Sequence, residues 1–134
     1  MPWRLSESAL PLRKKVWYNV YMVKEISVQE LKAKLDSGDK FYLIDARSAE
    51  DFEHNHIVEA INLPWGPEFT QKLPHVLPDK DAEIVVYGTN DACVMAKSAV
   101  DELNKLGYEN LALLGSGFIG WMESGLALEF GKAS

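Results

Sequence analysis

The 134-residue sequence contains a single cysteine, Cys93, and no apolar run approaching the roughly 18 residues that a membrane-spanning helix needs. One cysteine cannot form a disulfide within the chain, so the composition does not indicate an oxidising compartment. No continuous apolar segment typical of a signal peptide follows the basic residues near the N-terminus. The sequence therefore predicts a cytoplasmic protein that does not associate with membranes.

The chain is long enough for one domain with a proper hydrophobic core, and its 47% hydrophobic and 25% charged residues are typical of a globular protein. Its charge is uneven. Residues 1–22 carry +3, so the rest of the chain carries −9 of the total of −6. An acidic body argues against nucleic acid as a partner. We expect an N-terminal extension over residues 1–22 and a domain over residues 23–134, with Met22 as an alternative start.

The extension contains the basic and aromatic stretch RKKVWYNVY, from Arg13 to Tyr21. Such a stretch is compatible with binding RNA or an anionic membrane. The simpler interpretation, which we favour, is an additional element that packs on the body or on a second copy of the chain. A homodimer formed through residues 1–22 is therefore one of the expected assemblies.

From about Val23 onward, short apolar runs alternate with helical patterns. Ser27 and Glu30 form a capping box that opens a helix ending at Gly38. The expected strands are Phe41–Ile44, Ala60–Pro64, Ile84–Tyr87 and Leu111–Leu114. A second helix is expected to begin near Ser48 to Asp51, and a third to run from Glu68 to Leu73, closed by Pro74. A further helix is expected from about Cys93 to Leu106, and a final short one contains Trp121 and Met122.

Fully apolar strands flanked by helices predict an α/β fold, with a central parallel sheet covered by helices on both faces. Ligands bind at the carboxyl ends of the strands in such sheets. Asp45 and the loop Gly88, Thr89, Asn90, Asp91, Ala92 and Cys93 follow two of these ends. We expect several N–H groups of this loop to point into one small space, which makes it a candidate anion-binding cradle.

Three segments together resemble the rhodanese-like family of sulfurtransferases. The first is LIDARSAEDFEHNHIVEAINLP (Leu43–Pro64), the second is VVYGTNDACVMAKSAVDELNKLGYENL, and the third is LLGSGFIGWMESGL (Leu113–Leu126). The resemblance covers roughly residues 23–130. In the first segment it is carried by Asp45, Arg47, Glu50, Phe52, His56, Ile57, Ala60, Asn62, Leu63 and Pro64.

This resemblance implies a single-domain rhodanese-like fold of three layers and a history of sulfur transfer. In the family a cysteine at the first loop position takes sulfane sulfur from thiosulfate or a similar donor and holds it as a persulfide. That chemistry needs a thiolate, hydrogen-bond donors for the developing anion and usually a cationic side chain for an anionic donor. No further cofactor is implied.

The sequence departs from the family at the position of the nucleophile. Gly88 stands there and cannot carry a persulfide, the loop contains no arginine, and Asp91 would repel an anionic donor. Milder departures are Asn55 and Glu59, where glycines usually flank the His-Ile step, and Ser116 in place of the first of two paired glycines. We therefore expect a non-catalytic binding or regulatory module, a pseudoenzyme whose ligand is a partner protein, a small anion or a sulfur compound.

Cys93 supports an alternative function. Some family members carry a second cysteine five residues after the nucleophile, which is the position of Cys93, and the start of a helix favours a thiolate. The alternative is a sulfurtransferase or persulfide carrier that uses Cys93. Against it, a free cysteine is often only a small buried residue. The loop supplies no base or cation, and Lys97 lies a turn further along the helix.

Other polar candidates have structural interpretations. We expect Asp45 and Arg47 to pair with the loop backbone and with acidic neighbours at the rim of the site, and His56 to be structural. His54 and His56 form a His-x-His pair without further ligands, so no metal site is predicted. Trp65 and Trp121 are expected to pack in the core or at the rim.

Overall fold

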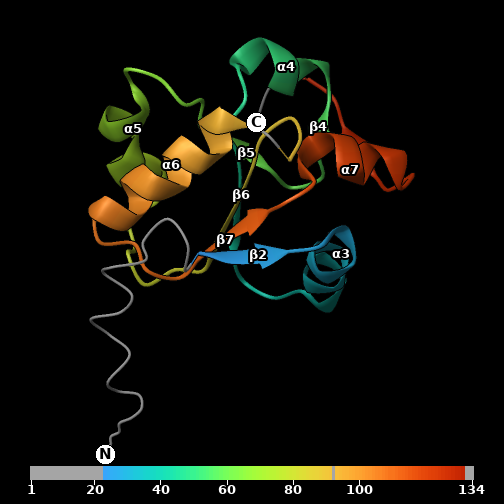
Figure 1. Ribbon diagram of the computed structural model, residues 1–134, viewed down its shortest axis with the longest axis horizontal. Coiled ribbons are helices and arrows are strands. Elements are labelled where there is room, and N and C mark those ends of the chain that lie inside the picture. The colour runs from blue at the N-terminus through green and yellow to red at the C-terminus, as the bar shows by residue number, and fades with distance from the viewer. Residues whose placement is uncertain (1–22, 92, 132–134) are drawn as a thin grey trace, which may run out of the picture.

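The computed structural model describes residues 23–91 and 93–131 (Figure 1). At its centre lies a five-stranded sheet with the order β2-β7-β6-β3-β5. All of its strand pairs are parallel, which confirms the predicted α/β class. The strands are β2 (Lys24–Ile26), β3 (Tyr42–Asp45), β5 (Ile61–Asn62), β6 (Ile84–Tyr87) and β7 (Leu111–Leu114).

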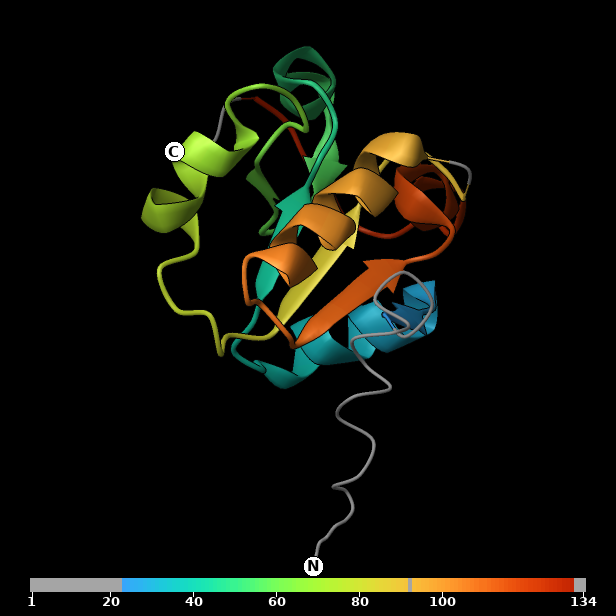
Figure 2. The ribbon, with the colours of Figure 1, turned by 60° about the vertical axis from the view of Figure 1, so that its left-hand side comes forward.

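Helices cover both faces of this sheet. Ile44 and Val86 face one core with α5 (Phe69–Val76) and α6 (Val94–Lys105). Leu43 and Val85, their neighbours in the strands, face a second core with α3 (Val28–Ser37), α4 (Ala49–His54) and α7 (Gly117–Glu123). The alternation of side chains along each strand produces the two cores. Figure 2 shows α6 on one side of the sheet and α3 on the other.

Local signals fix the ends of α3 as predicted. The Ser27 hydroxyl accepts a hydrogen bond from the Glu30 N–H at 3.1 Å, and the Glu30 carboxylate accepts one from the Ser27 N–H at 2.9 Å. The helix ends at Gly38, whose φ of 77° lies in the left-handed region that favours glycine.

The end predicted for α5 is wrong, because the helix continues through Pro74 to Val76. Proline removes one donor from the helix, but the Leu77 N–H still donates to the Leu73 C=O at 2.7 Å. Leu73 and Leu77 are both buried. Burial of these two leucines therefore holds the last turn in place.

Three short strands had no counterpart in the sequence analysis. One is β2, at the edge of the main sheet. The others, β4 (His56–Ile57) and β8 (Leu128–Glu129), form a separate antiparallel pair. Two-residue strands show no periodic pattern, and they form here because segments distant in sequence meet.

No helix among residues 23–91 and 93–131 is long and apolar enough to cross a membrane. The basic extension expected over residues 1–22, with its predicted role in dimerisation, lies outside the described residues.

Candidate functional site

The predicted cradle is the loop between β6 and α6, at the carboxyl end of the sheet. Strand β6 ends at Tyr87 and α6 begins at Val94, with Cys93 as its N-cap residue. The Cys93 N–H donates to the Asn90 C=O at 3.2 Å, which closes a turn within the loop. The Cys93 side chain makes no capping hydrogen bond. Its thiol is therefore not engaged in starting the helix.

The Cys93 side chain lies against Gly88. A Cβ atom built on Gly88 would lie 2.1 Å from the Cys93 Sγ, 2.7 Å from the Cys93 Cβ and 3.1 Å from the Ala96 Cβ. Separations of this size are far below van der Waals contact, so the thiol fills the space that a side chain at position 88 would take. Only 9% of the Cys93 surface is exposed. Residues 88 and 93 are five positions apart in the sequence, but the Cys93 side chain occupies the space next to Gly88.

The start of α7 holds the loop from the other side. The Phe118 N–H donates to the Gly88 C=O at 2.8 Å, and the Ile119 N–H donates to the Thr89 C=O at 2.9 Å. Gly117 allows this approach, because its φ is 68° and a Cβ there would lie 2.8 Å from the Asn90 N and 2.9 Å from the Gly88 O. This is the second glycine of the family's pair. The preceding residue, Ser116, is exposed.

A buried polar network surrounds Tyr87, the residue directly before the loop. Arg47 Nη2 contacts Asp45 Oδ2 at 2.8 Å, and the Tyr87 hydroxyl donates to the same oxygen at 2.7 Å. The Tyr87 oxygen also accepts a hydrogen bond from the Ile57 N–H at 3.1 Å. Arg47 Nη2 donates further to the Asn55 C=O at 2.7 Å. Tyr87 thus connects β6 with β3 and with β4, a role that the sequence analysis missed.

Arg47 pairs with an acidic neighbour, Asp45, and with the Asn55 backbone, in line with the expected pairing. The two side chains are only 4% and 0% exposed, so they are buried and do not form an exposed rim. Their structural role stays a prediction. Burial, and then the charge of the neighbouring Asp45, raise the pKa of Tyr87 well above its ordinary value. Burial lowers the pKa of Arg47, but the hydrogen bond and charge of Asp45 outweigh this and raise it overall.

His56 packs against Phe52 of α4. Its ring stacks on Phe52 with centroids 3.6 Å apart, and its Nδ1 is 2.7 Å from the Phe52 carbonyl oxygen. Its Nε2 is 3.4 Å from a carboxylate oxygen of Glu129 on β8. Within the described part of the chain, no group of three or more His, Cys, Asp or Glu side chains is arranged to hold a metal ion.

The other departures from the family differ in their backbone. Glu59 has a φ of 68°, the only positive φ of a non-glycine residue in the described ranges. A glycine fits such a position better. Asn55 has an extended backbone with a φ of −168°, which any residue adopts.

Trp121 is buried and donates to the Ala127 C=O at 2.9 Å, whereas Trp65 is half-buried beside Phe69.

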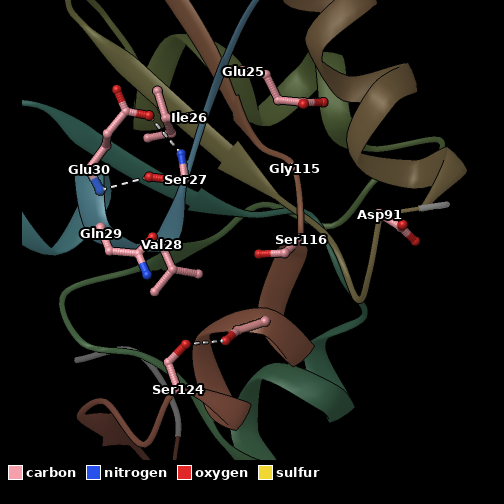
Figure 3. Close-up of a pocket in the computed structure, with 11 residues that line it drawn as sticks. Glu25, Ile26, Ser27, Val28, Gln29, Glu30, Asp91, Gly115, Ser116 and Ser124 are labelled. Carbon is pink, nitrogen blue, oxygen red and sulfur yellow. Dashed lines mark hydrogen bonds between the residues drawn. The ribbon is translucent and has the colours of Figure 1, made fainter.

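A groove of about 810 Å³ borders the loop at Asp91 (Figure 3). Its walls come from the end of β2, the start of α3 and the segment that leads into α7. No Lys or Arg is found among its lining residues in the described ranges. The residues that line it are Glu25, Ile26, Ser27, Val28, Gln29, Glu30, Asp91, Gly115, Ser116, Gly120 and Ser124. This groove was not predictable from local sequence patterns, because three distant segments build it.

The sequence matches the model of a known protein family over most of the described residues. A family model described as "Rhodanese-like domain" matches residues 27–124. The chain belongs to the rhodanese-like domain family. The match contains the loop, the buried Asp45–Arg47 pair and the α7 segment that holds the loop.

Solved structures share the fold of this rhodanese-like domain. The rhodanese-like domain of the Alr3790 protein from Anabaena superposes with a TM-score of 0.71 at 26% identity, covering 81% of this chain and 80% of that one. The thiosulfate sulfurtransferase from Pseudomonas aeruginosa gives a TM-score of 0.73 at 28% identity, covering 81% of this chain and 20% of that one.

Among curated proteins, the chain is 29% identical over 115 residues to the protein HIGH ARSENIC CONTENT 1, mitochondrial, of Arabidopsis thaliana. This match covers 78% of the chain and 65% of the Arabidopsis protein. The chain spans smaller shares of several other curated relatives. It is therefore related to sulfurtransferases as a single rhodanese-like domain.

Proposed function

We propose that this rhodanese-like domain carries sulfane sulfur as a persulfide on Cys93, and that it has no nucleophile at position 88. One observation carries the proposal. The Cys93 Sγ lies 2.1 Å from the point where a Cβ on residue 88 would stand, so a thiol is present where the family keeps its reactive side chain. The relationship to a thiosulfate sulfurtransferase supports the reaction class.

The proposed step is an exchange of sulfur between thiols. The Cys93 thiolate attacks the outer sulfur of a donor persulfide, a new S–S bond forms at Cys93, the S–S bond of the donor breaks, and the donor leaves as a thiolate. No external oxidant or reductant is consumed. Transfer to an acceptor thiolate is the same step in reverse. The N–H groups of the loop and the start of α6 are suited to the negative charge of a persulfide.

A second candidate is the binding or regulatory module without sulfur chemistry, which the sequence alone favoured. The low exposure of Cys93, at 9%, supports it, because an enclosed thiol is less accessible to a donor. The exposed Asp91 in the loop and the absence of Lys and Arg from the described loop residues also support it. Both candidates share one expectation, which is that Gly88 takes no part in catalysis.

We expect folded protein incubated with cysteine persulfide to gain about 32 Da, the mass of one sulfur, on Cys93 by mass spectrometry. A Cys93→Ser variant is the matched control and should gain nothing. The same treatment in urea shows whether the thiol itself is competent. An adduct that forms in urea but never in the folded protein would favour the binding module.

Thiosulfate:cyanide turnover tests the shared expectation. The native chain should show no turnover above the Cys93→Ala variant. Asp91 in the loop repels the anionic donor thiosulfate, and no described loop residue is a cation that could attract it. A clear rate that survives Cys93→Ala would contradict both candidates, since no thiol would remain in the chain.

A further inference from the structure

We propose that the molecule that exchanges sulfur with Cys93 is a positively charged segment of another protein. This inference rests on the proposed function and specifies its partner. It is drawn from the groove that borders the loop at Asp91 and from the charges along its walls.

Carboxylates dominate the charged groups of the groove. Glu25, Glu30 and Asp91 line it, and no Lys or Arg does so within residues 23–91 and 93–131. The Glu30 carboxylate accepts a hydrogen bond from the Ser27 N–H. Glu25 and Asp91 have no ion-pair partner in the same ranges, and both are exposed. Their charges therefore act on whatever enters the groove.

The Glu25 side chain lies over Gly115 at the wall of the groove. A Cβ on Gly115 would lie 2.8 Å from the Glu25 Cδ and 3.1 Å from its Oε1, so the carboxylate lies directly on this glycine. In the view of Figure 3, Glu25 lies near Gly115, and Asp91 lies across the Gly115–Ser116 segment from Ser27 and Val28. Lys24, the neighbouring cation on β2, lines a different hollow.

The charge of Asp91 is close enough to influence reactions of the thiol. Two peptide units separate Asp91 from Cys93, so their Cα atoms are at most about 7.6 Å apart. This is within the Debye length of roughly 8 Å at physiological ionic strength. At this distance the Asp91 charge repels a negative donor such as thiosulfate and attracts a positive one.

The size and chemistry of the groove favour a peptide over a small inorganic donor. Its volume of about 810 Å³ is in the upper part of the range for ligand sites, and it is open to solvent along the protein surface. The hydroxyls of Ser27, Ser116 and Ser124 line it and can hydrogen-bond to an extended backbone. The lining reaches Asp91, two residues before Cys93, so a lysine- or arginine-bearing segment bound to these carboxylates would bring a central cysteine toward the thiol.

The test compares three nine-residue peptides that carry one central cysteine with a thiopyridyl leaving group, flanked by lysine, serine or glutamate. Cys93 displaces the leaving group, whose release is followed by absorbance. At low salt the lysine peptide should react about tenfold faster than the glutamate peptide, with the serine peptide between them. In 1 M salt, where the Debye length is about 3 Å, the three rates should converge.

The Glu25→Gln/Asp91→Asn variant should lose most of the ratio between the lysine and glutamate peptides. Asp81→Asn is the matched control, because it removes an exposed carboxylate before β6, at the opposite end of the strand from Gly88. It should keep the ratio. Equal rates for the three peptides at low salt, or a ratio that the double variant keeps, would overturn the inference and leave the Cys93 reaction standing. Failure of even the serine peptide to react with folded protein would overturn the proposed function as well.

Discussion

Gly88 and Cys93 are best understood as one feature, because the side chain of the second residue occupies the place left by the first. A motif comparison identifies both residues by their spacing, but it cannot show that they touch. The contact depends on the turn that the Cys93 N–H makes with the Asn90 C=O and on the way α6 starts. The identities of the site residues were thus predictable from the sequence, and their mutual position was not.

This contact predicts that Gly88→Cys does not simply restore a nucleophile. The new Cβ would overlap the Cys93 side chain, and overpacking of a filled core costs about 1–3 kcal/mol of unfolding free energy. The Gly88→Cys/Cys93→Gly variant removes the two closest contacts and should recover most of that loss in urea unfolding. Cys93→Gly alone is the control, since glycine is acceptable as an N-cap residue.

The same double variant separates the shape of the loop from its chemistry. If the loop keeps the family geometry, the thiol at position 88 should label with cysteine persulfide. A folded double variant that resists labelling would show that the backbone of the loop has changed as well.

At the scale of elements, Tyr87 joins three segments that are distant in sequence. Its hydroxyl donates to Asp45 on β3 and accepts from the Ile57 N–H on β4, while its backbone belongs to β6. Local patterns predicted β3 and β6, since each is a short apolar run. They could not predict β4 or β8, whose pairing brings together residues about seventy positions apart along the chain, such as His56 and Glu129.

We predict that Tyr87→Phe lowers the unfolding free energy by about 1–3 kcal/mol, because it leaves the Ile57 N–H and one oxygen of Asp45 without their partner. Urea unfolding at pH 8 measures the change. Tyr42→Phe is the control, because Tyr42 is half-buried on β3 and belongs to no such network in the described ranges. A loss of equal size in both variants would contradict the special role of Tyr87.

The effect of Tyr87→Phe should also depend on pH. The pKa of Tyr87 is raised in the folded state above its ordinary value of 10.0, so its contribution to stability is complete below pH 10 and declines as the unfolded chain ionises. The gap between native protein and Tyr87→Phe should therefore narrow by roughly 1 kcal/mol between pH 8 and pH 10.5. A gap that widens with pH would contradict this assignment.

At the scale of the whole molecule, the described residues form two hydrophobic cores on the two faces of a five-stranded sheet. Apolar strands alternating with amphipathic helices were sufficient to predict this architecture. The groove was not predictable, because Glu25, Asp91 and Ser116 belong to segments that meet only in the folded chain. Sequence patterns predict the strands and helices of such a fold, but they do not predict the grooves that its loops form together.

The division of the chain at residue 22 stays a prediction and has a direct test. A chain that begins at Met22 should fold with an unfolding free energy within about 1 kcal/mol of the full-length protein. The mass in solution, measured by light scattering, should fall from a dimer to a monomer on this deletion. A monomeric full-length chain would contradict dimerisation through residues 1–22, and an unfolded deletion variant would contradict the domain boundary.

The two hydrogen bonds from α7 to the Gly88 and Thr89 carbonyls join backbone to backbone, so they do not depend on which side chains stand at those positions. Gly117, which permits this approach, lies on a different segment from either cysteine position. We therefore expect that two substitutions, which exchange the residues at positions 88 and 93, move the reactive sulfur and leave both hydrogen bonds in place. Inactive and active descendants of one ancestor would then be nearly superimposable, and the presence of the fold alone would not reveal which of them a genome encodes.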